Sequence, residues 1–294
     1  MSFKMSFPML IMIAAALCLF IVLPGGRSGP AGASGDSGND RLMREYLEIE
    51  SMSPPRFDSL TAEKRQYLFD AVANHEVAGI KMLKKYDPEG IIGFCYGRAM
   101  ASHLIACRMG LAPGSIRKIF MVGVLNYCHG KEWRFHVSTI VKGDDGRWYA
   151  IDPTRTLKLD TVEGWVGTIR NSWDLRKKAH LYLTSTSAIT PDITIYPDID
   201  RETGEHIIEL SFDPARKAGF TLCDDMGLTL YRTDEESQYR YFLCTGSSRD
   251  ARFDFRKAVK NGREYSFNGY FEDLLDSIRK APDSLFEQGA ALPR

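Results

Sequence analysis

The chain has 294 residues, of which 38 are Lys or Arg and 38 are Asp or Glu, so its formal net charge is zero. This balance gives no electrostatic reason to expect a nucleic-acid or acidic-lipid partner. The hydrophobic fraction of 44% is ordinary for a globular protein and is enough for a core. The length predicts one large or two modest domains.

The first 23 residues predict a targeting segment. Lys4 is their only charged residue, and an apolar run follows over residues 9–23. This run is short for a membrane span but normal for the core of a signal peptide. Counted from residue 5 it is long enough for an uncleaved anchor, whereas a lipoprotein signal is disfavoured because Cys18 follows Leu17 in the middle of the run. We therefore expect an exported protein, either periplasmic or secreted after cleavage, or anchored on the outer side of a membrane.

A linker and two domains are expected after this segment. Residues 24–40 are rich in Gly and Ser and predict a flexible linker, which would be a tether if the anchor is retained. Residues 41–190 predict an α+β domain that carries the candidate catalytic residues. Residues 191–294 change to short β-like runs separated by turns, among them 251–255 and 264–270. They predict a small β-rich domain with a closing helix at 271–280. The sequence does not define an oligomeric state.

Two helices are expected at the start of the first domain. Residues 41–52 predict a short helix that Pro54 ends. Thr61 is the predicted N-cap of a longer helix that extends to residue 86. Residues 87–90, Asp-Pro-Glu-Gly, then break the helical pattern.

A third helix is expected to begin at Cys95. Apolar residues recur at three- and four-residue spacing from Ala99 to Cys107, and Gly110 marks the end of the pattern. A thiol in the first turn lies at the positive end of the helix dipole, which favours the thiolate. Most buried cysteines act only as small apolar residues. The assignment of Cys95 as a nucleophile therefore needs a base nearby.

A predicted hairpin supplies a base and a carboxylate. Residues 133–141 are rich in β-branched and aromatic residues and predict a strand that carries His136. Asp145-Gly146 is a turn signal, and the returning strand over residues 147–153 carries Asp152. Further strands are expected at 116–125 and 180–184. Thiol catalysis needs a base beside the thiol and a group that orients the base, and the order Cys, His, Asp provides both.

The length of the hairpin loop decides whether His136 and Asp152 share a face of the sheet. Side chains alternate between faces along a strand, so a two- or four-residue loop would send Asp152 to the face opposite His136. A three-residue loop over residues 144–146 would pair His136 with Thr154 and leave Asp152 diagonal to His136, within side-chain reach. Gly146 suits the left-handed conformation at the end of such a loop. We therefore predict this loop, with Asp152 bonded to one His136 ring nitrogen and Cys95 facing the other.

Three motifs in this region resemble those of a known group of thiol enzymes. They are Cys95-x-x-Arg98-Ala99, Trp133-x-x-His136-Val137 and Tyr149-x-Ile151-Asp152-Pro153. Over roughly residues 60–190 the chain resembles the bacterial protein-glutamine glutaminases and, more broadly, the transglutaminase-like superfamily. The resemblance implies a transglutaminase-like or papain-like core, in which a helix carrying the cysteine packs on an antiparallel sheet. It also implies that Cys95 is the nucleophile, His136 the base and Asp152 the group that orients the base.

The activity implied by this resemblance is deamidation of glutamine side chains in proteins or peptides through a thioester on Cys95. Transglutaminase and cysteine protease activities stay open because they share the same nucleophile chemistry. A papain-type arrangement is disfavoured, since the nearest glutamine upstream of Cys95 is Gln66. A non-catalytic binding or scaffold protein is the alternative from another class. No cofactor or metal is expected, because the sequence has neither a Cys-x-x-Cys pair nor a phosphate-binding glycine pattern.

Six cysteines lie at positions 18, 95, 107, 128, 223 and 244. If Cys95 is a nucleophile and Cys18 belongs to the targeting segment, the other four can form two disulfides in an oxidising compartment. A bridge between Cys223 and Cys244 within the second domain is one expectation. Four reduced, buried cysteines are the other.

Overall fold

The computed structural model divides into two compact units, residues 1–36 and 37–294. The described residues are 38–127, 131–154, 158–174, 179–184, 186, 189, 241–243, 253–260 and 263–287, all in the second unit. The expected targeting segment lies outside them, as does the expected linker up to residue 37. Across these described ranges, we find no helix with the length and apolar character that a membrane crossing requires.

The central element is a mixed sheet with the strand order β4-β3-β2-β1-β5-β6 over the described residues. Neighbouring strands are antiparallel except β5 and β6, which are parallel. The strands are β1 (Ile116–Tyr127), β2 (Lys131–Lys142), β3 (Trp148–Ile151), β4 (Asp160–Thr161), β5 (His180–Thr184) and β6 (Tyr241–Leu243). A separate hairpin joins β7 (Lys257–Lys260) to β8 (Arg263–Ser266). The expected mixture of helices and antiparallel sheet is therefore confirmed.

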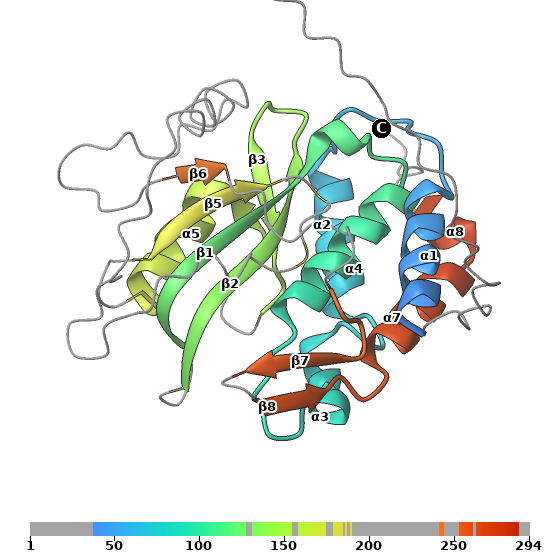
Figure 1. Cartoon of the computed structure of the whole chain (residues 1–294). Coiled ribbons are helices and arrows are strands. Elements are labelled where there is room, and N and C mark those ends of the chain that lie inside the picture. Colours follow the sequence, from blue (N-terminus) through green and yellow to red (C-terminus); the bar gives the residue numbers. More distant parts are fainter. Residues whose placement is uncertain are drawn as a thin grey trace, which may run out of the picture. The chain divides into compact units, whose positions relative to one another are not determined.

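Helices lie on both sides of this sheet (Figure 1). They are α1 (Gly38–Ser51), α2 (Ala62–Ala73), α3 (Leu83–Tyr86), α4 (Cys95–Arg108), α5 (Val162–Ser172), α7 (Tyr270–Lys280) and α8 (Asp283–Glu287), with 3-10 turns at Ile80–Met82 and Pro113–Ser115. One hydrophobic core contains α4 with α1, α2 and α7, and a second contains α5. Because strand side chains alternate, Val137 and Val141 of β2 join the first core while Ile140 joins the second.

The second helix is shorter than the sequence predicts. Thr61 is its N-cap, as expected, and accepts a hydrogen bond from Lys64 N–H. The helix ends at Ala73 instead of continuing to residue 86, because the His75 ring accepts the Val77 and Ala78 N–H groups. A Cβ at Gly79 would lie 2.6 Å from the His75 carbonyl oxygen, so the chain turns where only glycine fits.

The predicted three-residue hairpin loop is confirmed. Gly143 N–H donates to the Arg147 carbonyl at 2.7 Å, and strand pairs such as Val141 with Tyr149 continue the same register. Gly146 has φ +79°, the left-handed conformation that the loop requires. This register returns the chain so that Asp152, just beyond the end of β3, can reach the side of the sheet that His136 faces.

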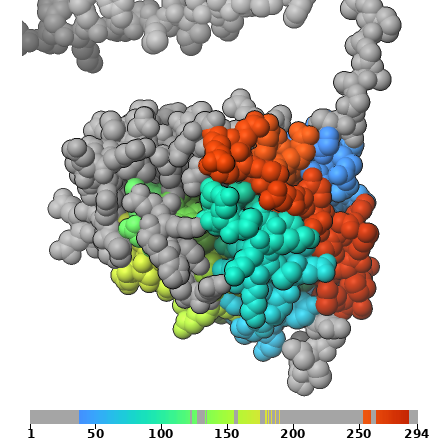
Figure 2. Space-filling model, turned by 90° about the horizontal axis from the view of Figure 1, so that it is seen from below, coloured from blue at the N-terminus to red at the C-terminus, as the bar shows by residue number. Residues whose placement is uncertain are grey.

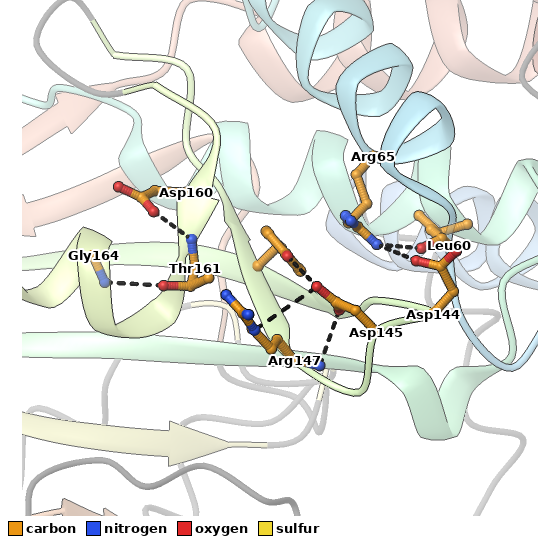
Figure 3. A network of polar contacts seen from close by, with 9 residues as sticks. Leu60, Arg65, Asp144, Asp145, Arg147, Asp160, Thr161 and Gly164 are labelled. Atoms are coloured by element: carbon orange, nitrogen blue, oxygen red, sulfur yellow. Dashed lines mark hydrogen bonds and ion pairs between the residues drawn. The ribbon is translucent and has the colours of Figure 1, made fainter.

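The hairpin loop is anchored to the start of α2 (Figure 3). The Arg65 guanidinium donates to the Leu60 carbonyl at 2.5 Å and to the Asp144 carboxylate at 2.9 Å. Leu60 N–H donates to the Lys142 carbonyl, and Asp144 N–H donates to the Leu60 carbonyl. Arg65 is buried and its guanidinium also lies over the Tyr149 ring. These contacts fix the loop of the hairpin, and thereby the strands that carry His136 and Asp152, against α2.

The described C-terminal residues 253–287 pack into the core that contains α4. Phe94, beside Cys95, stacks on Tyr270 with ring centroids 4.0 Å apart, and Tyr96 stacks on Phe271. Figure 2 shows the red C-terminal segment side by side with the blue-green segment around α3, where the Asn268 amide donates to the Tyr86 carbonyl. The expected boundary at residue 190 therefore does not separate these residues from the first domain, because their aromatic side chains complete its core. The strands expected between 191 and 240 lie outside the described residues.

The expected closing helix is present as α7, beginning at Tyr270 and ending at Lys280. The two runs before it differ from expectation. Residues 253–255 are not a strand, and the run expected at 264–270 forms only β8, which ends at Ser266. Asn268 and Gly269 both have positive φ, so the chain turns there into α7.

Candidate functional site

Cys95 is the first residue of α4, as the sequence predicts. The two residues before it have positive φ, +77° at Gly93 and +48° at Phe94. Phe94 is the N-cap residue and makes no side-chain cap bond, so the helix start is shaped by its backbone and by neighbouring side chains. Cys95 and Cys107 both lie on α4, are 4% exposed and form no disulfide.

The loop before Cys95 is held by the buried carboxylate of Asp87. Its Oδ1 accepts Ile91 N–H at 2.8 Å, and its Oδ2 accepts Ile92 N–H at 2.9 Å and Gly93 N–H at 2.7 Å. Charge-assisted bonds of this kind are stronger than neutral ones. The Trp133 ring packs against Gly93, where a Cβ would lie 1.7 Å from a ring carbon. Residue 93 is therefore restricted to glycine by both its conformation and its surroundings.

His136 contacts a carboxylate and is influenced by the thiol of Cys95. Its Nε2 is 2.5 Å from Asp152 Oδ2, and Cys95 at the start of α4 contributes to the ionisation of the ring. Because Nε2 is used by Asp152, the other ring nitrogen, Nδ1, is the one left to Cys95. The predicted contact between Asp152 and one His136 ring nitrogen is present, and the placement of Cys95 on the other nitrogen stays a prediction.

The ionisation of this group favours a protonated histidine. Burial opposes a charge on His136, but the Asp152 carboxylate, with a smaller contribution from Cys95, outweighs it and raises the pKa of His136 to about 9. Burial would likewise raise the pKa of Asp152, but the positive charges of His136 and Arg98 and a bond from Trp165 hold it below its ordinary value. At neutral pH the site therefore holds an imidazolium next to a carboxylate.

Two tryptophans for which the sequence pattern indicates no role contact the His136 ring. Trp165 of α5 donates its indole N–H to Asp152 Oδ2 at 2.8 Å, and its ring stacks on His136 with centroids 5.9 Å apart. Trp173 meets the His136 ring edge-on at 4.8 Å. Trp165 follows Asp152 by thirteen residues and belongs to a helix not predicted from the sequence, so only the fold reveals its contact with Asp152.

Two side-chain bonds fix α4 against the strands of the site. Thr139 of β2 donates its hydroxyl to the Ala99 carbonyl at 2.5 Å. Ser102, which is fully buried, lies within hydrogen-bond distance of both the Arg98 carbonyl and the Ile151 carbonyl beside Asp152. The position of Cys95 relative to His136 therefore depends on the packing of one helix on two strands.

The start of α4 also offers backbone donors. The first intrahelical bond near Cys95 is from Arg98 N–H to the Phe94 carbonyl, and within the described residues no acceptor is found for Cys95 N–H. Such amides at a helix start can bind developing negative charge on a substrate oxygen. A thiol, an imidazole, a carboxylate and an amide donor thus belong to one region of the fold, and acyl transfer through a thioester uses groups of these four kinds.

The described residues contain no cluster of three or more His, Cys, Asp or Glu side chains arranged to hold a metal ion. Cys128, Cys223 and Cys244 lie outside the described residues, so the expectations for their disulfides are untested.

No family model and no curated protein matches the chain. Among solved structures, the chain is similar to the NMR structure of protein-glutaminase from Chryseobacterium proteolyticum. The match covers 46% of this chain and 77% of that chain, with 18% sequence identity and a TM-score of 0.32. At this identity and TM-score, the likeness is weak and does not assign an activity to this chain.

Proposed function

We propose that the chain is a thiol-dependent amidohydrolase that deamidates glutamine side chains in proteins or peptides. The observation that carries the proposal is the hydrogen-bonded pair of His136 and Asp152, with Cys95, at the start of a buried helix, contributing to the ionisation of His136. The choice of glutamine as substrate is supported by the resemblance of the Cys95, His136 and Asp152 motifs to those of protein-glutamine glutaminases. The proposed core is transglutaminase-like, with the cysteine helix packed on the sheet.

The reaction follows from the roles of the three residues. The Cys95 thiolate attacks the carboxamide carbon of glutamine, and Cys95 N–H donates to the oxygen on which negative charge develops. Protonated His136 gives its proton to the departing nitrogen, so that ammonia leaves and a thioester remains on Cys95. Neutral His136 then takes a proton from water, which attacks the thioester and releases glutamate. Asp152 stabilises the imidazolium and keeps its ring oriented in both steps.

Two other outcomes share the first half of this reaction. If a primary amine instead of water attacks the thioester, the product is an isopeptide crosslink. If the attacked group is a main-chain amide, the enzyme is a protease. A binding protein with the same fold would neither form the thioester nor transfer it to water or an amine.

The test is to incubate the purified protein with casein or with a glutamine-containing peptide. We expect release of ammonia and conversion of glutamine to glutamate, detected by mass spectrometry, and loss of both in Cys95→Ala. Cys107→Ala is the matched control, because it removes an equally buried cysteine from the same helix. Crosslinking to an added amine would favour a transglutaminase and peptide cleavage a protease. A wild-type protein that gives none of these products would leave the binding protein as the better account.

We also propose that the protein acts outside the cytoplasm, because an apolar run of residues 9–23 follows a single lysine. N-terminal sequencing of the protein recovered from cell fractions tests this directly. A start downstream of the run indicates cleavage, and an intact start in the membrane fraction indicates an anchor. An intact chain in the cytoplasmic fraction contradicts export.

A further inference from the structure

Gly93, two residues before Cys95, is held on both sides by charged side chains. Its N–H donates to Asp87 Oδ2 at 2.7 Å, and its carbonyl accepts a hydrogen bond from Arg98 Nη1 at 3.0 Å. Both charged residues are buried, with Arg98 6% exposed and Asp87 8% exposed. The two peptide groups that flank Gly93 are therefore fixed independently of each other.

Arg98 has a second connection to the same loop and a third to the carboxylate of the site. Its own N–H donates to the Phe94 carbonyl at 3.0 Å, so one residue holds two consecutive carbonyls before the thiol. Its positive charge also lowers the pKa of Asp152. Asp152 is thus faced by His136 of β2, by Trp165 of α5 and by the charge of Arg98 of α4.

We propose that Arg98 is a positioning residue for Cys95, and that Asp87 is its counterpart on the other side of Gly93. The inference deepens the proposed function, because it rests on Cys95 as the nucleophile. Arg98 belongs to the Cys95-x-x-Arg98-Ala99 motif but takes no part in the steps described above. It acts through the backbone: by holding the Gly93 carbonyl, it sets the direction of the next peptide and hence of Cys95 and its N–H.

The physical reason for such a clamp is the backbone conformation. Positive φ at a non-glycine residue such as Phe94 is unfavourable and persists only where surrounding contacts hold it. Burial of a guanidinium is costly as well. Arg98 Nε has no hydrogen-bond partner among the described residues, so its burial is not explained by a saturated set of bonds. The bond to Gly93 and the electrostatic contact with Asp152 offset that cost at the site itself.

A matched comparison exists on the same helix. Arg108 is 2% exposed, lies ten residues further along α4, and donates to the carbonyls of Ile278 and Ala281 and to Asp283. It is a buried arginine that fixes backbone carbonyls, but at the end of the helix away from Cys95. Substitution at Arg108 therefore reproduces the loss of a structural arginine without a change at the thiol.

The experiment compares Arg98→Lys, Arg98→Met and Asp87→Asn with Arg108→Lys and Arg108→Met in the full chain. Two quantities are measured at a temperature where each variant is folded by circular dichroism: kcat and KM for ammonia release, and the rate of Cys95 alkylation by iodoacetamide as a function of pH. Misplacement of a reacting group by 1 Å can cost about 100-fold, so we expect kcat to fall by about 10-fold or more at Arg98 and Asp87, with KM nearly unchanged. The Arg108 variants should keep the wild-type kcat and alkylation profile while unfolding at a lower temperature.

The pH profile separates the two effects of Arg98. Arg98→Lys keeps the charge. Alkylation of Cys95 in this variant should be slower at every pH, but the acidic limb of its pH–rate profile should not shift. Arg98→Met loses the charge beside Asp152, so its acidic limb should also move to higher pH. If Arg98→Met does not fold, Arg98→Lys and Asp87→Asn still decide the matter through kcat and the alkylation rate.

Three results would separate this inference from the proposed function. Slower alkylation in Arg98→Lys, in a protein that releases no ammonia, would support positioning and overturn deamidation. Wild-type kcat and alkylation in both Arg98→Lys and Asp87→Asn would overturn positioning while leaving deamidation intact. Equal losses of kcat in the Arg98 and Arg108 variants would also overturn it, because the effect would then be general destabilisation.

Discussion

His136 and Asp152 are joined by a 2.5 Å contact between Nε2 and Oδ2, although they are not opposite each other in the sheet. The register of β2 and β3, which pairs Thr139 with Ile151, would place Thr154 opposite His136 if continued. Asp152 is therefore the diagonal neighbour, and it reaches His136 because a three-residue loop returns the chain. The same carboxylate oxygen accepts the Trp165 indole N–H.

Asp152→Asn should lower activity without disturbing the geometry of the site. An amide oxygen in the place of Oδ2 can still accept from both His136 and Trp165, so what is lost is the negative charge that stabilises the imidazolium. We expect kcat to fall by more than about 10-fold, up to the ~10⁴-fold seen for the equivalent change in serine triads. Steady-state ammonia release measures this, and an Asp152→Asn variant with wild-type kcat would remove Asp152 from the mechanism.

The left-handed residue of the hairpin loop should be sensitive to substitution even though an added methyl group there would contact nothing. Gly146 has φ +79°, and a Cβ there would have no atom within 4 Å, so Gly146→Ala tests backbone strain alone. We expect it to lower the free energy of unfolding by about 1–2 kcal/mol, measured in urea. Gly167, inside α5, also has open space around it, and there alanine should raise the free energy of unfolding by about 1 kcal/mol. Equal effects at the two positions would argue against a strained loop.

The hairpin and the cysteine helix could be predicted from sequence because their signals are local. Turn chemistry at Gly146 sets the register, and the register places Asp152 beside His136. The contact of Trp165 with Asp152 could not be predicted, because it joins segments whose separation in space depends on the complete fold. Asp87 and Arg98 lie close in sequence to the backbone groups that they bind, but those bonds depend on the left-handed backbone at Gly93 and Phe94, which periodicity does not reveal. The end of α2 at Ala73 depends on a side-chain cap from His75, which periodicity does not reveal.

The packing of residues 253–287 into the core around Phe94 could not be predicted for a related reason. The strand-like pattern after residue 190 predicts a separate domain, but buried aromatic residues from 253–287 belong to the core around Phe94. Amphipathic patterns show that a helix such as α7 buries one face. They do not show against which partner it does so.

A protein fragment comprising residues 41–190 should therefore fail to fold cooperatively. It would lack Phe253, Phe255, Phe267, Tyr270, Phe271, Leu274, Leu275, Ile278 and Phe286, all of which are buried. Burial of one such side chain stabilises a protein by about 1.5–3 kcal/mol, so the loss of the set is comparable with the usual stability of a domain, about 5–15 kcal/mol. Thermal unfolding followed by circular dichroism tests this, with residues 38–287 as the control. A sharp transition in the shorter fragment would contradict the single core.

His136 should contribute stability that is lost in alkaline solution. Its pKa is raised from 6.5 to about 9, so its contribution is complete below about pH 6.5 and disappears as the pH rises through about 9. The difference in free energy of unfolding between wild type and His136→Gln, measured in urea, should therefore be larger at about pH 6 than at about pH 10. A difference that does not change between these two conditions would mean that the histidine is not held as an imidazolium.

The most direct test of the account is the rate at which iodoacetamide alkylates Cys95 and Cys107 in the folded protein at mildly acidic pH. Both thiols lie on α4 and each is 4% exposed, so a difference in rate reflects chemistry more than access. A thiolate paired with imidazolium reacts where an ordinary thiol, with a pKa of about 8.5, is protonated. We predict that Cys95 is labelled much faster than Cys107 and that His136→Ala removes the difference. Equal, slow labelling of the two cysteines in the wild-type protein would contradict the assignment of Cys95 as a nucleophile.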